Sequence, residues 1–329
     1  MLRTSVFILF LFFQLNAFSQ NRIGTTEALL IREAKIISDE TGDNIWAGIS
    51  KTPFAIVLVT DSIEFLIYHP YPSADFKFTY SDSILQADVY SRGRTYPKNW
   101  LATFPAVSGV NCIVVGTPAN TGRSLTDWMI TLLHEHFHQY VNSQPGYFAS
   151  VNALNLSGGD QTGMWMLNYP FPYDSVVVIE QYEKYTAALI NAVNSIGKKG
   201  FIAMLNSFTK EKEKFKALLK PEDYRYFSFQ VWQEGLAAYT EYKFLASVTE
   251  HKISPELEDL SGFTALPDYK NAFFKNKMKD LRELKLAADK RICIYAVGFA
   301  EGILLDTLNK NWREKYFTDK FSTDNYFKK

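Results

Sequence analysis

The sequence predicts an α+β fold in which a mixed β-sheet lobe is followed by a mainly helical lobe. Short apolar or alternating runs fill residues 54–115, whereas apolar positions at helical spacing dominate from Ser124 onward. Strands that come first and helices that follow are typical of α+β proteins. With 329 residues, 47% of them hydrophobic, the chain can bury a substantial core. We expect a sheet-rich lobe over residues 20–123 and a helical lobe over residues 124–329, together forming a single domain.

The first 19 residues have the features of a secretory signal peptide. Arg3 gives a positively charged N-terminal end, and residues 6–13 are apolar. Ala17 and Ser19 are small residues two positions apart, as a cleavage site requires. The apolar run is shorter than the roughly 20 residues that cross a bilayer, and no later stretch is apolar enough. We expect cleavage to leave an extracytoplasmic protein, secreted or periplasmic, without a membrane segment. An uncleaved membrane anchor is the alternative.

Charge and cysteine content exclude several classes of protein. The chain has 35 basic and 35 acidic residues, whereas a nucleic-acid-binding protein needs a basic surplus to neutralise phosphates. Two cysteines, Cys112 and Cys293, are too few for a disulfide scaffold or a cysteine-rich zinc module. Whether these two form a bridge stays open, as does the oligomeric state.

The expected elements follow from periodicity. Residues 25–42 are an amphipathic helix, and two apolar runs around Asp61-Ser62 form a hairpin. A helix begins at Ser124, where Ser124 and Asp127 resemble a capping box, and runs to about Asn142. The lysines and glutamates of residues 209–216 are interpreted as a solvated helix face. The aromatic run 165–173 is interpreted as core, with a lining of the cleft as the alternative. Further strands are expected at 75–80, 84–90 and 112–115, and further helices at 175–196, 201–218, 224–248, 268–289 and 293–310.

The residues that carry chemistry are His134-Glu135-His136-Phe137-His138, inside the helix that begins at Ser124. His134 and His138 are four apart, so both imidazoles project from one helical face, as two ligands of a tetrahedral Zn²⁺ do. Glu135 is rotated by about 100° from His134. It can therefore act as general base toward a metal-activated water without being a ligand. His136 points away from the ligand face and is expected to pack or hydrogen-bond locally.

A third zinc ligand must be a carboxylate, because His69 and His251 stand outside any motif. The best candidate lies in Trp232-Gln-Glu-Gly-Leu-Ala-Ala-Tyr-Thr-Glu241. His-Glu-x-x-His followed by Glu-Gly-x-Ala-x-Tyr-x-Glu resembles the gluzincin metallopeptidases, most closely the third-ligand helix of the aminopeptidase N type.

The resemblance implies one Zn²⁺ per chain, held by His134, His138 and Glu234, with Glu135 as general base. It implies a thermolysin-like architecture with zinc in the cleft and hydrolysis of peptide or protein substrates. An edge strand within residues 104–115 would pair with the substrate. The chain lacks the Gly-x-Met-Glu-Asn-like segment that captures a substrate amino terminus in aminopeptidase N, so endopeptidase and exopeptidase activity both stay open.

Other residues are candidates for supporting roles. Gluzincins often use a tyrosine or histidine to stabilise the oxyanion; Tyr295 is the first candidate and Tyr239 the second. Glu241 is expected to accept a hydrogen bond from a ligating histidine. Gly235, Ala237 and Ala238 have small side chains or none. They are expected to let the helix that carries Glu234 approach the helix that carries His134 and His138. Glu301, in a second Glu-Gly pair, is the alternative third ligand.

Two other functions compete with peptide hydrolysis. One is a non-catalytic exported binding or scaffold protein with a structural or relic zinc site. Such a non-catalytic protein has no evident need for Glu135, and a structural zinc site would use a fourth protein ligand. The other is zinc-dependent hydrolysis of a non-peptide amide.

Overall fold

The computed structural model describes residues 22–248 and 253–327, so the expected signal peptide lies outside the described residues. Within these ranges the chain forms two compact units. The sheet unit consists of the described residues up to Ile36, Pro53–Gln139 and Ile253–Phe263. The helical unit consists of Ile37–Thr52 and the described residues of Tyr140–Lys252 and Thr264–Lys329.

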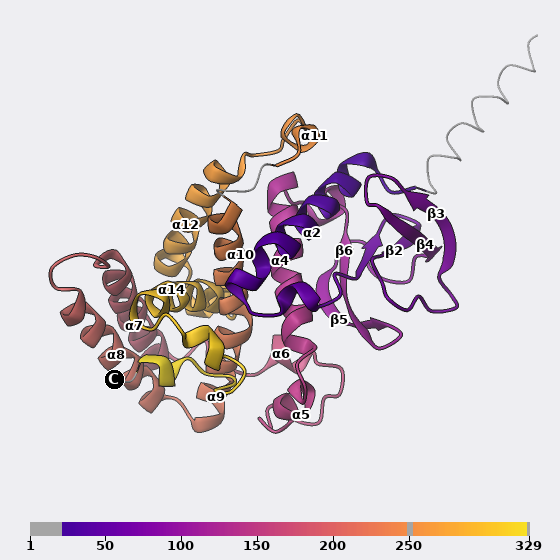
Figure 1. Ribbon diagram of the computed structural model, residues 1–329. Coiled ribbons are helices and arrows are strands. Elements are labelled where there is room, and N and C mark those ends of the chain that lie inside the picture. Colours follow the sequence, from indigo (N-terminus) through magenta and orange to yellow (C-terminus); the bar gives the residue numbers. More distant parts are fainter. Residues whose placement is uncertain (1–21, 249–252, 328–329) are drawn as a thin grey trace, which may run out of the picture. The chain divides into compact units, whose positions relative to one another are not determined.

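The predicted order of a mixed sheet first and helices afterwards is confirmed (Figure 1). Six strands lie in the order β3-β4-β2-β1-β6-β5, so β5 is an edge strand. β1 and β6 are parallel, whereas every other neighbouring pair is antiparallel, including the predicted hairpin of β1 and β2. The strands are β1 Ile56–Val59, β2 Ile63–Ile67, β3 Lys77–Asp82, β4 Ala87–Gly93, β5 Leu101–Val107 and β6 Val110–Gly116.

The long helix α4, Leu125–Asn142, is attached to the sheet near both of its ends. Near its start, the Trp128 indole donates to the main-chain oxygen of Gly116, 2.7 Å away, at the end of β6. Near its end, the Gln139 amide donates to the main-chain oxygens of Ala55 and Asn111 at 2.8 and 2.9 Å. The helix therefore runs antiparallel to β6. The expected cap is present, since the Asp127 N–H donates to the Ser124 hydroxyl at 3.3 Å.

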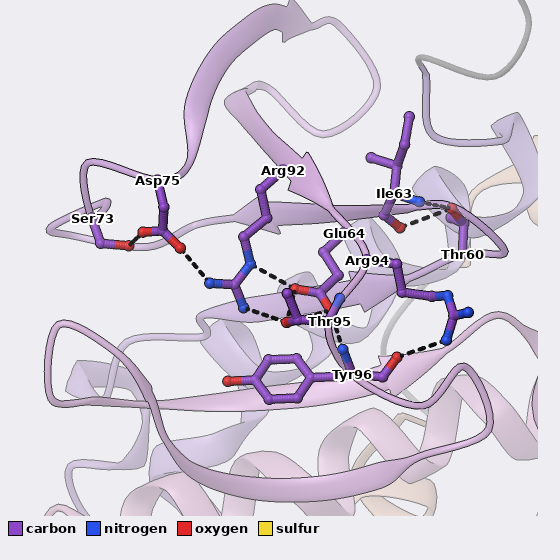
Figure 2. Close-up of polar contacts among 9 residues, drawn as sticks. All are labelled: Thr60, Ile63, Glu64, Ser73, Asp75, Arg92, Arg94, Thr95 and Tyr96. Carbon is purple, nitrogen blue, oxygen red and sulfur yellow. Dashed lines mark hydrogen bonds and ion pairs between the residues drawn. The ribbon is translucent and has the colours of Figure 1, made fainter.

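A buried carboxylate holds the loop that leads into β5 (Figure 2). Glu64 is fully buried and accepts hydrogen bonds from Arg92 Nε at 2.7 Å and from the main-chain N–H groups of Thr95 and Tyr96 at 2.6 and 2.5 Å. The Arg92 guanidinium also pairs with Asp75 at 2.5 Å. A buried charge is tolerated when it is paired and hydrogen-bonded, as Glu64 is. The network fixes the chain just before the edge strand.

The helical unit is built around α14, whose side chains are buried along most of its length. α14 packs against α7, α10 and α12 of the same unit (Figure 1). The sequence-based bounds are met within a few residues for most helices, and those of α8 agree at both ends. The longer helices are α7 Val176–Asn194, α8 Phe201–Leu218, α9 Pro221–Gln230, α10 Leu236–Ser247, α12 Leu266–Glu283 and α14 Ile292–Leu308, and α2 Thr25–Ile45 precedes the sheet.

The shorter helices lie in the segments that connect these elements. They are η2 Ile49–Lys51, α3 Pro118–Thr121, α5 Tyr147–Asn152, α6 Trp165–Asn168, α11 Pro255–Glu258, α13 Leu286–Asp289, η5 Trp312–Lys315 and η6 Asp324–Phe327. No helix within the described ranges is both long enough and apolar enough to span a membrane.

The helix expected over residues 224–248 is interrupted by a π-helical turn, η3, Val231–Gly235. Gly235 lies against Gly298 of α14, where a Cβ atom added to Gly235 would lie 2.5 Å from the Gly298 Cα. The expectation that Gly235 serves the approach to the zinc helix is therefore wrong: its missing side chain makes room for α14. π-turns are rare and occur frequently at functional sites.

The prediction of a solvated face over residues 209–216 is wrong for one residue. Lys212 is buried, and its ammonium group lies 2.8 Å from the Glu301 carboxylate and 3.2 Å from that of Asp324. Glu301 also accepts a hydrogen bond from the Tyr185 hydroxyl. The pattern of charges alone did not show that one lysine points inward toward a buried acid on another helix.

The contact between Gly235 and Gly298 gives the first prediction. A Cβ on Gly298 would lie 2.4 Å from the Gly235 Cα and 2.7 Å from the Val231 oxygen, all of them backbone atoms that cannot easily yield. Helix propensity alone favours Gly→Ala by about 1 kcal/mol, so a loss of stability must come from this contact. We expect Gly298→Ala to lower the free energy of unfolding by about 3 kcal/mol in urea titrations followed by circular dichroism.

Gly93→Ala is the matched control, because nothing lies within 4 Å of a Cβ placed there. A Gly298→Ala protein as stable as the wild type would show that the two helices can separate without cost.

Candidate metal centre

His134 and His138 lie one turn apart on α4 and face each other. Their Nε2 atoms are 3.1 Å apart, their ring centroids are 4.8 Å apart, and each residue is 7% exposed. Two nitrogens that each lie about 2.0–2.1 Å from a tetrahedral cation are separated by about 3.3 Å. The two imidazoles are therefore close to the spacing that one shared cation requires.

His136 points to the other side of the helix, as predicted. Its Nδ1 is 2.8 Å from the Gln139 side-chain oxygen, and its ring lies 4.6 Å from that of Phe54. The same Gln139 amide donates to the sheet. His136 thus belongs to the contact between α4 and the strands and not to the histidine pair.

Glu135 is 7% exposed and makes a contact that was not predicted from the sequence. The Thr103 hydroxyl of β5 lies 2.8 Å from the Glu135 Oε2 and 3.1 Å from the Glu135 main-chain oxygen. At about 100° per residue, Glu135 points within about 20° of Trp128, which is on the sheet side of the helix. No sequence signal gave this contact, because it depends on which strand lies beside α4 and in which register.

Glu234 is placed by the π-turn η3 in the helical unit, where its carboxylate has defined neighbours. The Tyr295 hydroxyl of α14 interacts with this carboxylate, and Arg291 Nη1 donates to the Tyr295 oxygen at 3.0 Å. The adjacent Gln233 accepts a hydrogen bond from Tyr147 at 3.1 Å. Arg291 was not predicted, because it lies before the helix expected over residues 293–310; the structure places it at the N-cap of α14.

His134, His138 and Glu234 form a possible metal-binding triad. Each offers one ligand atom, and these atoms all lie within 4.8 Å of one another. Two imidazole nitrogens and one carboxylate oxygen make a donor set that suits a divalent cation, and three protein ligands leave positions open for water or substrate. Glu135 is not part of the triad.

The two tyrosine candidates differ in their surroundings. Burial, and then the negative charge of Glu234, raise the pKa of Tyr295 well above its usual value, so the phenol keeps its proton at neutral pH. Tyr239 is fully buried; its hydroxyl donates to Asp306 Oδ1 at 2.7 Å and accepts from Arg313 at 2.6 Å. Tyr239 therefore serves a buried polar network, whereas Tyr295 touches a member of the triad.

The other candidate ligands have separate roles. Glu301, the alternative third ligand, is paired with the buried Lys212. His69 accepts a hydrogen bond from the Tyr71 main-chain N–H through Nδ1, and its Nε2 lies 3.1 Å from the Val107 oxygen, so it is a satisfied structural histidine. His251 lies outside the described residues. Glu241 lies on α10, and its role as acceptor for a ligating histidine stays a prediction.

Both cysteines are buried free thiols. Burial raises the pKa of Cys112 to about 12 and that of Cys293 to about 11, so neither is a reactive nucleophile near neutral pH. Trp165, Phe171 and Tyr173 of the aromatic run are buried, as expected for core residues.

Comparison of the chain with protein-family models, with curated proteins and with solved structures gives no match.

The triad predicts that the chain binds one divalent cation, which can be tested with Zn²⁺ as the probe. We expect His134→Ala, His138→Ala and Glu234→Ala each to weaken Zn²⁺ binding in calorimetric titrations by at least 100-fold, because each removes one of three ligands. His69→Gln is the control and is expected to bind as tightly as wild type. Unchanged binding by Glu234→Ala would remove Glu234 from the site.

Proposed function

We propose that this chain is an exported, zinc-dependent hydrolase of peptide bonds of the gluzincin type. The observation that carries the proposal is the triad of His134, His138 and Glu234, with a glutamate that is not a ligand next to the first histidine. The thermolysin-like architecture, the single metallopeptidase domain over residues 20–329 and the extracytoplasmic location belong to the same proposal.

The choice of zinc rests on the donor set. Zn²⁺ accepts imidazole nitrogen and carboxylate oxygen in tetrahedral sites, and two histidines with one glutamate are a set that catalytic zinc uses. When bound, zinc supplies Lewis acidity, which acidifies a water and polarises a scissile carbonyl. His134 and His138 would hold the ion through their Nε2 atoms, and Glu234 would hold it through one carboxylate oxygen.

Glu135 is the general base of the proposed reaction. It takes a proton from the attacking water and later delivers it to the nitrogen of the leaving amine, so the carboxylate is regenerated after each turnover. Its low exposure keeps bulk water from competing for that proton. One carboxylate oxygen is held by Thr103, which leaves the other available for the reaction.

Tyr295 is the proposed donor to the oxyanion. The phenol is protonated at neutral pH, and Arg291 lies against its oxygen. A neutral hydroxyl polarised by a guanidinium can donate to the oxygen that gains negative charge as the carbonyl is attacked. The same hydroxyl interacts with Glu234, so this donor would turn toward the substrate during the reaction.

The non-catalytic alternative finds less support. A structural zinc site ordinarily has four protein ligands, whereas the candidate group within the described residues has three. Zinc-dependent hydrolysis of a non-peptide amide uses the same residues and is separated from peptide hydrolysis by the substrate assay below.

The role of Glu135 can be tested by converting its carboxylate to an amide. We expect Glu135→Gln to retain zinc and to hydrolyse casein at least about 100-fold more slowly than wild type, because the amide cannot accept the proton. Asp127→Asn on the same helix is the control and keeps full activity. A chelator should abolish wild-type hydrolysis, and added zinc should restore it.

Full activity of Glu135→Gln would contradict the mechanism. A chelator that lowers only the melting temperature, in a protein without any hydrolytic activity on casein, would favour the non-catalytic alternative.

The role of Tyr295 is tested by removing its hydroxyl. We expect Tyr295→Phe to lower kcat about 100-fold with zinc affinity little changed, since the oxyanion loses one donor. Tyr239→Phe is the control: it loses bonds to Asp306 and Arg313, so we expect lower stability with normal kcat. If Tyr295→Phe instead weakens zinc binding and leaves kcat of the loaded enzyme unchanged, Tyr295 only positions Glu234.

A further inference from the structure

We propose that Thr103 is a positioning residue for Glu135, holding one oxygen of its carboxylate so that the other faces the reacting water. This inference rests on the proposed function and adds a residue outside both zinc motifs. The Thr103 hydroxyl lies 2.8 Å from Glu135 Oε2, a distance typical of a hydroxyl that donates to a carboxylate.

The sheet fixes the direction in which Thr103 points. Thr103 pairs with Ile113 of β6, and its hydroxyl reaches α4. Side chains alternate along a strand, so the next residue, Phe104, lies on the opposite face. There it packs against the apolar cluster that includes Val57, Cys112 and Val114. A rotation of β5 that removed Thr103 from Glu135 would also expose Phe104.

The chain before β5 is fixed as well. Glu64 accepts hydrogen bonds from the main-chain N–H groups of Thr95 and Tyr96 (Figure 2). The Gly116 N–H donates to the main-chain oxygen of Trp100 at 2.9 Å, immediately before the strand begins. Catalytic groups act most efficiently when the residues that orient them are themselves rigid. The edge strand therefore delivers the hydroxyl to Glu135 from a fixed position.

The hydroxyl has one hydrogen and two acceptors within reach. It donates to Oε2 at 2.8 Å while the carboxylate is charged, because a charge-assisted bond is stronger than one to a neutral carbonyl. The main-chain oxygen of Glu135, at 3.1 Å, offers a second acceptor without movement of the strand.

A purely structural role predicts a different result. If the hydroxyl only braced β5 against α4, its removal would lower the stability or weaken substrate binding. A positioning role predicts that kcat falls while KM and zinc affinity stay unchanged. The two roles are therefore separated by measuring all of these quantities on one set of variants.

The test compares Thr103→Val, Thr103→Ser and Thr121→Val in the full chain. Valine matches threonine in shape and lacks the hydroxyl, whereas serine keeps it. Thr121 is the control, because its hydroxyl bonds to main-chain oxygens of Thr117 and Pro118. We expect Thr103→Val to lower kcat for casein peptides about 10- to 100-fold, the effect of one hydrogen bond to a charged group. Thr103→Ser should recover most of the loss, and Thr121→Val should behave as wild type.

The second readout needs no activity. In the zinc-free protein, the free energies of unfolding of wild type, Thr103→Val, Glu135→Gln and the double variant form a double-mutant cycle. The effects of the two changes on this free energy should be non-additive, because the side chains touch. We expect the zinc affinity of each of these variants, measured by competition with a chelator, to be within twofold of that of wild type. A fall in zinc affinity or a rise in KM with normal kcat would overturn the positioning role.

Failure of this inference is distinguishable from failure of the proposed function. If wild type hydrolyses casein and Thr103→Val is equally fast, the inference fails alone. If wild type with one bound zinc hydrolyses no peptide substrate, the proposed function fails, and the positioning role of Thr103 fails with it.

Discussion

The attachment of α4 to the sheet is the constraint on which the candidate site depends. Trp128 binds the main chain at the end of β6, and Gln139 binds it at the start of β1 and β6, so the helix can neither rotate nor slide freely. These two residues lie on one side of the helix, and His136 packs on the same side. His134 and His138 are then left facing each other away from the strands, and Glu135 is brought to the edge strand.

A second constraint acts within the helical unit. Gly235 and Gly298 have no side chains, so the backbones of η3 and α14 approach each other more closely than any side chain would permit. The close approach accompanies a π-turn, which carries Glu234, and Tyr295 of α14 interacts with that carboxylate. Arg291, at the N-cap of the same helix, donates to the phenol oxygen. One contact between two glycines thus defines the surroundings of the proposed third ligand.

Periodicity and motif spacing predicted what depends on local sequence. The sheet, most helices, the orientation of His136 and the histidine pair all follow from patterns of two and 3.6 residues. Features that depend on tertiary contacts were missed. The inward turn of Lys212 requires a buried acid on another helix, the partner of Gly235 is set by packing, and the bond from Thr103 to Glu135 requires the strand order. Tyr295 was the first oxyanion candidate and Tyr239 the second, but only their structural neighbours show that Tyr239 belongs to a separate polar network with Asp306 and Arg313.

The most direct measurement is anomalous diffraction at the zinc absorption edge from crystals of the zinc-loaded protein. We expect one peak per chain, bonded to Nε2 of His134, Nε2 of His138 and a carboxylate oxygen of Glu234, with Glu135 close by and not bonded. A peak at other residues would contradict the account, as would a fourth protein ligand that closes the site or the absence of a peak at this triad when zinc is present in excess.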